Sequence, residues 1–429
     1  MATTLVGSAT IGNVAQASGL SNQSRIFYGI NSARWFIFFQ TAGDTTHVNC
    51  WVSSSNDLSS ATWAAIGTGA TSPASTAVVA NEGRHIGIAY QSIAANDIAY
   101  LVISTSDITT AAATQAIRVS LTSTVATLSS WVNTTTTPTP SSNIPTGSTA
   151  GISTTGRAWL IQSRFTQDKD FCAAIATNAD AGTSWTSGWG AATLLDNSMA
   201  NTVNSGGLAQ LASGLMLGVA DTGVLTATTL NQIFVKSTSA TAWPANAVRA
   251  KIFAADTGAA QDKNDWAMGA TSTSDIHVVR RATSTSFDHR RTTDGVTWGT
   301  LVTITSTGLT GHLAGSGLGL ASDGTSMWLF VIDTDANKNI KYLKWTSGGG
   351  WDAAWSTLST SDTNTKAFIN VSDSVGNNQI GVIWTENAST PFAIVGSFLS
   401  TAAGGSIPPG LGPVVSMQEP FHLDVAMMR

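Results

Sequence analysis

The sequence predicts an all-β propeller, in which four-stranded antiparallel sheets form the blades of a ring. The first observation is that short apolar runs rich in aromatic and β-branched residues recur in pairs, each pair joined by a polar turn. The second is that seven such pairs begin at intervals of 51 to 72 residues along the chain. Repeats made only of strands and turns are typical of propellers at this period, and the intervals leave room for four strands per blade.

The strand pairs predict blade hairpins near residues 34–54, 85–104, 157–177, 215–237, 276–292, 327–346 and 379–399. We expect seven blades, with six as the alternative. The last repeat lacks a fourth strand of its own, whereas strand-like residues 4–11 precede the first repeat. Pairing this N-terminal strand with the last repeat would close the ring and remove exposed sheet edges.

Two segments depart from the repeat. Residues 134–148 are rich in Pro and Thr and follow the second repeat, so we expect an extended surface loop there. The propeller is expected to span residues 1–400. Residues 401–429 begin with a Gly/Pro linker and continue into an apolar, Met-rich stretch. This stretch predicts a docking tail that packs on a partner or on another copy of the chain, with a disordered terminus as the alternative.

Charge and hydropathy exclude several classes of partner. Only 10% of the residues are charged and the net charge is −5, so we expect no nucleic-acid partner. No apolar run approaches the ~18 residues that a membrane span needs, so no membrane insertion is expected. Residues 1–16 do not have the pattern of a secretory signal. The two cysteines, Cys50 and Cys172, are expected to be free thiols rather than a disulfide.

The loop at residues 178–185, NADAGTSW, resembles the Asp-box, S-x-D-x-G-x-T-W, of sialidase-like propellers. Degenerate versions follow the second strands of other hairpins. The resemblance implies that the Asp caps backbone N–H groups, the Gly takes a positive φ and the Trp packs between blades. The structural residues that it implies are Asp57, Trp63, Asp180, Gly182, Trp185, Asp294, Gly295 and Trp298. These are turn-forming roles, so the resemblance supports the fold and specifies no activity.

A sialidase-like activity would require an arginine triad, an acid/base Asp and a Tyr–Glu pair. Arg34, Arg84 and Arg157 begin or flank the first strands of hairpins, so they are candidates for binding a ligand at the central channel. The alternative is that they bond to backbone carbonyls at blade edges. The chain has only three Glu and four Tyr, without a recognisable Tyr–Glu pair. We therefore assign no catalytic residue and predict that the protein is not an enzyme.

Tryptophan is abundant, with 15 residues, and most positions fit the core. Trp189, Trp351 and Trp355 are less constrained by the repeat. They are candidates for stacking on sugar rings, with core packing as the alternative.

No cofactor or metal is predicted. The weak candidate is a Ca²⁺ loop at Asp333, Asp335 and Asn337, which resembles the opening of an EF-hand loop. Lys338 and Lys344 stand where that loop needs Gly and Glu. The six histidines are scattered without metal-ligand spacing.

The leading functional hypothesis is a non-enzymatic, adhesin-like virion protein of a tailed bacteriophage. It would recognise a host surface glycan and bind other virion proteins or its own copies through the C-terminal tail. A low-charge, Ser/Thr-rich surface suggests an extracellular setting without a visible export signal, which a virion protein made in the host cytoplasm would reconcile. One alternative is a glycoside hydrolase or lyase whose acid and base are turn aspartates. Another is an exported lectin or surface adhesin.

Overall fold

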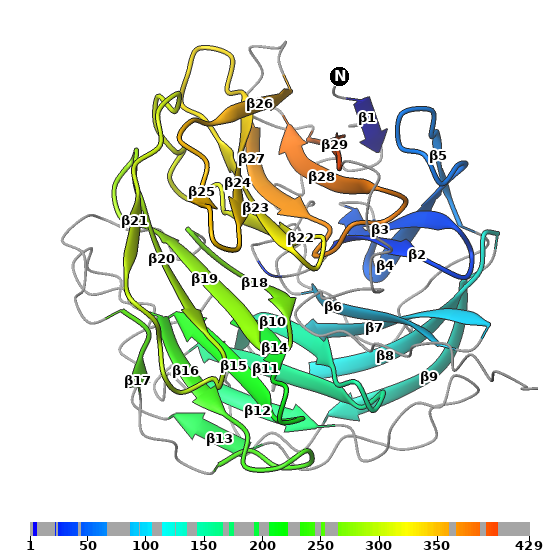
Figure 1. The fold of residues 1–429 in the computed structure, drawn as a ribbon. Helices are drawn as coiled ribbons and strands as arrows, with labels where there is room; N and C mark the ends of the chain where they lie inside the picture. Colours follow the sequence, from blue (N-terminus) through cyan, green and yellow to red (C-terminus); the bar gives the residue numbers. More distant parts are fainter. Residues whose placement is uncertain are drawn as a thin grey trace, which may run out of the picture.

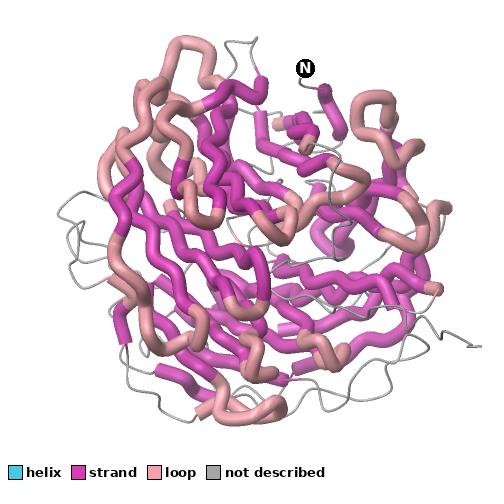
Figure 2. The backbone as a smooth tube through the Cα atoms, viewed as in Figure 1, coloured by secondary structure: helices cyan, strands magenta, loops and turns pink. Residues whose placement is uncertain are grey.

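The computed structural model describes residues 3–6, 22, 25–41, 44–66, 86–93, 95–104, 114–124, 126–134, 144–165, 171–175, 193–196, 206–221, 232–244, 250–253, 265–359, 366–386 and 392–401. Every regular element in these ranges is a β-strand, and Figure 2 shows strands and loops only. The strands form seven antiparallel sheets, which follow one another around a ring in chain order (Figure 1). The prediction of an all-β propeller is therefore confirmed.

Sheets 1 to 4 each contain four strands that are consecutive in the chain. Sheet 1 consists of β2 (Ile26–Gly29), β3 (Arg34–Thr41), β4 (Asp44–Ser53) and β5 (Trp63–Ala65). Sheet 2 consists of β6 (Ile86–Ile93), β7 (Asn96–Ser104), β8 (Thr114–Leu121) and β9 (Ala126–Thr134). Sheet 3 consists of β10 (Ile144–Ile152), β11 (Ala158–Phe165), β12 (Phe171–Ile175) and β13 (Thr193–Asp196). Sheet 4 consists of β14 (Gly206–Gln210), β15 (Met216–Asp221), β16 (Gln232–Lys236) and β17 (Ala250–Lys251).

Sheet 5 has the same order, whereas sheets 6 and 7 vary it. Sheet 5 consists of β18 (Trp266–Ser272), β19 (Asp275–Arg281), β20 (Phe287–Thr292) and β21 (Val302–Ile304). Sheet 6 consists of β22 (Gly319–Ser322), β23 (Ser326–Ile332), β24 (Ile340–Thr346), β25 (Gly350–Trp351) and β26 (Ser356–Ser359), the last two both pairing with β24. Sheet 7 consists of β27 (Lys366–Val371), β28 (Gln379–Glu386), β29 (Ala393–Ser400) and the N-terminal β1 (Thr3–Val6).

The N-terminal strand β1 belongs to the same sheet as β27, β28 and β29, the last described strands of the chain. It pairs antiparallel with β29, Thr3 lying opposite Gly396 and Val6 opposite Ile394. A Cβ atom on Gly396 would lie 2.7 Å from Leu5 Cδ1, so the absence of a side chain at Gly396 leaves the space that Leu5 occupies. Figure 1 shows β1 next to β29, between sheet 6 and sheet 1.

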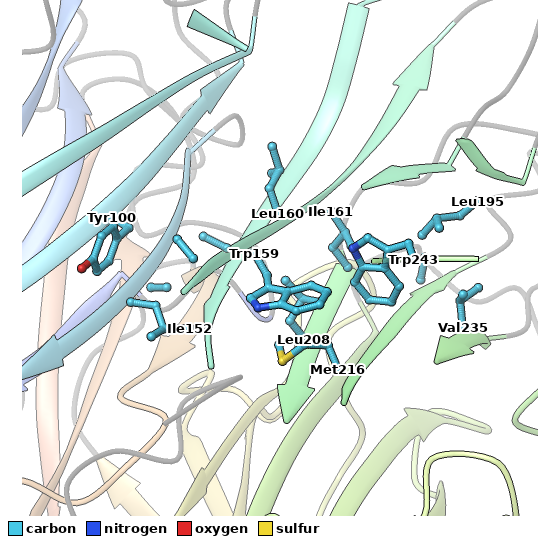
Figure 3. Packing of buried hydrophobic residues seen from close by; sticks show 14 of the residues in the cluster. Tyr100, Ile152, Trp159, Leu160, Ile161, Leu195, Leu208, Met216, Val235 and Trp243 are labelled. Atoms are coloured by element: carbon cyan, nitrogen blue, oxygen red, sulfur yellow. The ribbon is translucent and has the colours of Figure 1, made fainter. Parts of the chain in front are cut away.

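The core lies between the sheets rather than within any one of them. The first strand of each sheet contacts the first strand of the next, and β27 of sheet 7 contacts β2 of sheet 1. Strands packed on both faces bury consecutive residues, as in β23, where all seven residues are buried. Between sheets 3 and 4, Trp159 packs edge-on against Trp243 at a centroid distance of 5.2 Å, beside Leu208 and Met216 (Figure 3).

The second repeat differs from its prediction. The hairpin near residues 85–104 exists as β6 and β7, but these are the first and second strands of sheet 2. The other six predicted hairpins are second and third strands of their sheets. This hairpin therefore lies one strand earlier in its sheet than the others, which lengthens the interval between it and the third hairpin. The insertion at residues 134–148, which was expected to explain that interval, is correspondingly shorter.

Part of the predicted loop at residues 134–148 is therefore a strand. Residues 144–148 begin β10, the first strand of sheet 3. The pairing of β10 with β11 shifts register between Pro145 and Gly147. Proline cannot donate a ladder hydrogen bond and is tolerated at such bulges, which is why the Pro-containing pattern concealed a strand. Residues 402–429, including most of the predicted tail, lie outside the described residues.

Two further findings concern a cysteine and the absence of membrane-spanning helices among the described residues. Cys50 is a buried free thiol in β4, and burial raises its pKa. No helix able to cross a membrane occurs in the part of the chain that the structure describes.

Candidate functional site

The loop between the third and fourth strands of sheet 5 is built around a capping carboxylate. Asp294 Oδ1 accepts hydrogen bonds from the backbone N–H groups of Val296, at 2.8 Å, and Thr297, at 2.7 Å. These bonds hold the pKa of Asp294 below its usual value. Gly295 has a φ of 70°, in the left-handed region that favours glycine.

The same loop joins sheet 5 to sheet 4. The Trp298 ring lies 5.4 Å from the ring of Phe234 in β16. A Cβ atom on Gly295 would lie 2.7 Å from Leu211 Cδ1, so the loop backbone approaches sheet 4 closely. This loop therefore acts as an inter-sheet clamp.

We expect Gly295→Ala to lower the free energy of unfolding by about 2–3 kcal/mol, because it adds both backbone strain and a steric clash. The matched control is Gly348→Ala, since Gly348 has a φ of 83° but no atom within 4 Å of an added Cβ. The control isolates strain and should cost about 1 kcal/mol. Urea denaturation measures both; equal losses in the two variants would contradict a clash at Leu211.

The corresponding loop of sheet 1 is fastened to sheet 7 by polar contacts. Asp57 Oδ1 accepts hydrogen bonds from Ser59 N, at 2.8 Å, and from Gln379 Nε2, at 2.7 Å. Gln379 Oε1 in turn accepts a bond from Leu58 N at 2.8 Å. The hydrogen bonds from the backbone and side chain of Ser59, then that from Gln379, lower the pKa of Asp57, so its carboxylate is charged at neutral pH.

A half-open pocket of about 300 Å³ lies at this junction of sheets 7 and 1, and we call it the seam pocket. Four elements converge on it: β1, β2, the loop after β4 with the start of β5, and β29. Its lining residues are Leu5, Ile26, Leu58, Ser59, Ala61, Trp63, Gly396, Ser397 and Phe398. Ile26 belongs to the innermost strand and is buried, so the pocket extends inward from a partly exposed rim.

The seam pocket lies beside Trp63, in the loop of sheet 1 that corresponds to the clamp of sheet 5. In the equivalent loops of sheets 5 and 6, Trp298 packs on Phe234, and Trp355 lies 5.5 Å from the Phe287 ring. Both phenylalanines belong to the third strand of the preceding sheet. In sheet 7 that strand is β29, which contributes Gly396, Ser397 and Phe398 to the pocket. Trp63 is partly exposed, as Trp298 is, and it lies beside the cavity.

A chain of polar side chains forms a second cluster, between sheets 5 and 6; its two histidines, His277 and His289, are buried, and its other members are partly exposed. Trp351 Nε1 donates to His289 Nδ1 at 3.1 Å, and His289 Nε2 lies 2.9 Å from His277 Nδ1. His277 Nε2 lies 3.2 Å from Asp275 Oδ2, and Asp275 Oδ1 accepts a bond from Arg291 at 2.7 Å. An indole nitrogen only donates, so His289 Nδ1 must be an acceptor and its Nε2 must carry the proton. The same logic makes His277 a neutral ring that donates from Nε2 to Asp275.

The pKa values agree with two neutral imidazoles. Burial is the main cause that lowers the pKa of His289, to about 3, and the charge of Arg291 adds to it. Burial also lowers the pKa of His277, although Asp275 opposes this effect. For Asp275, burial raises the pKa, but the hydrogen bonds from His277, Thr271 and Arg291 outweigh it and leave the pKa below its usual value. The cluster is a buried relay with fixed proton positions.

Two of the turn aspartates that the structure describes, Asp97 and Asp333, are caps rather than free acids. Asp97 accepts hydrogen bonds from the backbone of Asn31, at 3.1 Å, and Ser32, at 2.7 Å. Asp333 accepts from Thr310 N and Gly311 N and lies 3.3 Å from Lys341 Nζ. Both carboxylates are at most 1% exposed, so a polysaccharide in solution does not reach them.

The other residues of the weak Ca²⁺ candidate are also engaged in turn contacts. Asp335 bonds to the backbone and side chain of Asn339, at 2.9 and 2.8 Å, and the carbonyl of Asn337 accepts a bond from Lys366 at 3.3 Å. Lys341 occupies the side of Asp333 where a cation would bind. No cluster of potential metal ligands occurs among the residues that the structure describes.

The structure does not bring the predicted ligand-binding residues together. Arg34 bonds to the carbonyl of Ala33 at the start of β3 in sheet 1, whereas Arg157 lies in the turn before β11 of sheet 3. Trp351 belongs to the buried relay. The prediction that Trp355 is available for a sugar is wrong, because it is 7% exposed and packs on Phe287. Arg84, Asp180, Gly182, Trp185 and Trp189 lie outside the described residues.

No protein-family model matches the sequence, and no curated protein matches it. Among solved structures, the chain is similar to a PL25 ulvan lyase bound to -[GlcA(1-4)Rha3S]-, with a TM-score of 0.58, 9% identity, and 92% of this chain and 95% of that chain covered. More distant likenesses are the NanB sialidase from Streptococcus pneumoniae, with a TM-score of 0.43, 13% identity, and 90% and 70% covered, and the Aleuria aurantia lectin, with 0.45, 11%, and 85% and 98%.

At these identities the lyase structure supports the fold alone. The class of protein that the fold defines is an all-β propeller.

Proposed function

We propose that this protein is a glycan-binding propeller that holds a sugar in the seam pocket without turning it over. The observation that carries the proposal is a partly exposed tryptophan, Trp63, beside a half-open cavity of about 300 Å³. This volume lies at the lower end of the ~300–1,000 Å³ typical of small-molecule sites. The apolar face of a sugar ring stacks on an indole, and its hydroxyls bond to serines and backbone groups at the rim.

The lining supports binding rather than bond cleavage. Glycoside hydrolysis generally needs two carboxyl groups on either side of the scissile bond. The described lining consists of apolar side chains, Gly396 and two serines. The nearest carboxylate in the same loop, Asp57, is held by Ser59 and Gln379. The glycan-acting propellers among the structural neighbours support a carbohydrate as the class of ligand.

The test is a glycan array probed with the purified full chain and with Trp63→Ala, followed by analysis of the glycans for cleavage. We expect the wild type to bind a subset of glycans and to leave them intact. The variant should bind about ten-fold more weakly, because an aromatic contact is worth ~1–1.5 kcal/mol. Thermal unfolding shows whether the variant is folded. Absence of binding to every glycan would refute the proposal, and released sugar would refute binding without turnover.

The seven sheets are proposed to be seven blades of one ring, with β1 as the strand that closes it. The proposal is supported by the pairing of β1 with β29 and by the contacts of β27 with both β22 and β2. An experimental structure that placed β1 away from β29 would contradict this closure.

A virion role is proposed from composition. The low charge and Ser/Thr content fit a particle surface, and glycan recognition fits attachment to a host cell. Display of many copies would convert weak single sites into firm attachment. Co-sedimentation with phage particles and light scattering compare the full chain with a form that ends at Gly404. If both forms associate equally, residues 405–429 are not the docking element.

A further inference from the structure

We infer that the seam pocket selects a neutral sugar that carries a methyl group, as a 6-deoxyhexose or an N-acetylhexosamine does. The inference rests on the proposed function and specifies the ligand of the same site. It follows from the lining of the pocket, whose described residues include few polar side chains and no charged one.

The charge of the site disfavours acidic sugars. No charged side chain is among the described residues that line the pocket. The adjacent charge is the carboxylate of Asp57, whose pKa is lowered by bonds from Ser59 and Gln379, so it is negative at neutral pH. A uronate, sialate or sulfate group in the pocket would lose hydration and meet a like charge, with no cation among the described lining residues to offset either cost.

The polarity of the site favours a methyl group. Leu5, Leu58, Trp63 and Phe398 contribute partly exposed apolar surface, and Ile26 lines the buried part. The polar side chains of the lining are the hydroxyls of Ser59 and Ser397. Ser59 already donates to Asp57 from its side chain and its backbone. Few polar side-chain atoms are thus left for the hydroxyls of an ordinary hexose.

These features distinguish sugars that differ in one substituent, a methyl group or a hydroxymethyl group. A hydroxymethyl group placed against the leucines and Phe398 would leave its hydroxyl desolvated without a partner, which is unfavourable. A methyl group at the same place buries apolar surface instead. We expect the methyl-bearing sugar to bind about ten-fold more tightly than its hydroxylated counterpart.

The experiment measures dissociation constants by saturation-transfer NMR and calorimetry for matched sugars. The pairs are D-fucose with D-galactose and N-acetylglucosamine with glucose, and glucuronic acid is the acidic probe. A preference for D-fucose, for N-acetylglucosamine or for both supports the inference and identifies the source of the methyl group. Equal affinity within both pairs, or tighter binding of glucuronic acid, overturns it while leaving glycan binding intact. Absence of binding by all five sugars and by the glycan array refutes the proposed function instead.

A variant assigns the preference to the apolar wall. Leu58→Ser should reduce the ratio of affinities within the preferred pair from about ten-fold to about two-fold. The control is Val296→Ser, because Val296 is 56% exposed in the equivalent loop of sheet 5 and lies outside the seam pocket. An unchanged ratio in Leu58→Ser would place the methyl group elsewhere and contradict the assignment.

Discussion

Ala61→Phe is expected to abolish glycan binding while leaving the fold intact. Ala61 lines the seam pocket and is partly exposed, so a phenyl ring placed there occupies the space of the sugar without removing a packed side chain. Affinity for the best glycan on the array should fall at least 100-fold. Surface substitutions of this kind usually change the free energy of unfolding by less than about 0.5 kcal/mol.

The matched control is Ala64→Phe. Successive residues of a strand point to opposite faces, so Ala64 of β5 faces away from the side that bears Trp63. It is exposed and does not line the pocket. Wild-type affinity in Ala64→Phe and lost affinity in Ala61→Phe would locate the ligand at the seam. Equal affinity in the two variants would exclude the seam pocket as the binding site.

Acid is expected to destabilise the fold through the buried relay. The pKa of His289 is about 3 in the folded protein and about 6.5 when the chain is unfolded. Between these values the unfolded chain binds a proton that the folded chain does not, so stability is complete above pH 6.5 and falls as the pH decreases towards 3. For His289 alone, the loss from pH 7 to pH 4.5 is about 2–3 kcal/mol.

Urea denaturation at the two pH values measures this loss, and His289→Gln serves as the reference. A glutamine can accept from Trp351 and donate to His277 but does not titrate. The wild type should lose about 2–3 kcal/mol more than the variant over this pH interval, and carboxylates contribute equally to both. Identical losses would show that His289 is protonated in the folded state. Nitrogen chemical shifts of the imidazoles provide a second measurement, since the His289 ring should remain neutral at pH 5.

The strands could be predicted from the sequence because their pattern is local. Runs such as RWFIFFQ combine aromatic and β-branched residues between polar turns, and β3 begins at Arg34. The first strands of sheets were harder to recognise. β10 contains Pro145 and several small residues, so it lacks the aromatic and β-branched run that indicates the other strands.

The seam pocket could not be predicted because its residues are distant in the chain. Leu5, Trp63 and Phe398 meet only when β1 pairs with β29 and sheet 7 packs on sheet 1. The Asp-box resemblance implies a structural role for Trp63, and the cavity beside it is completed by residues of another sheet. No local pattern contains that information.

The sequence contains a pattern that indicates the histidine pair of the buried relay. The separation of His277 and His289 in the sequence does not match a metal-binding motif, but both residues lie in one predicted hairpin. In the β19–β20 register, His277 is opposite Arg291 and Val279 is opposite His289, which places the two histidines diagonally on one face. An antiparallel pairing of the two strands of that hairpin therefore predicts that the two histidines lie close together.

The pairing of β1 with β29 determines how the molecule responds to mechanical load. The N-terminal end of β1, at Thr3, lies opposite Gly396, whereas its other end, at Val6, lies opposite Ile394. The N-terminal end of β1 and the C-terminal end of β29 therefore emerge at the same end of the ladder. Tension applied through the two chain ends peels the hydrogen bonds apart one after another instead of loading them together. The first rupture under force should occur at this sheet, at low force, before the other six sheets are disturbed.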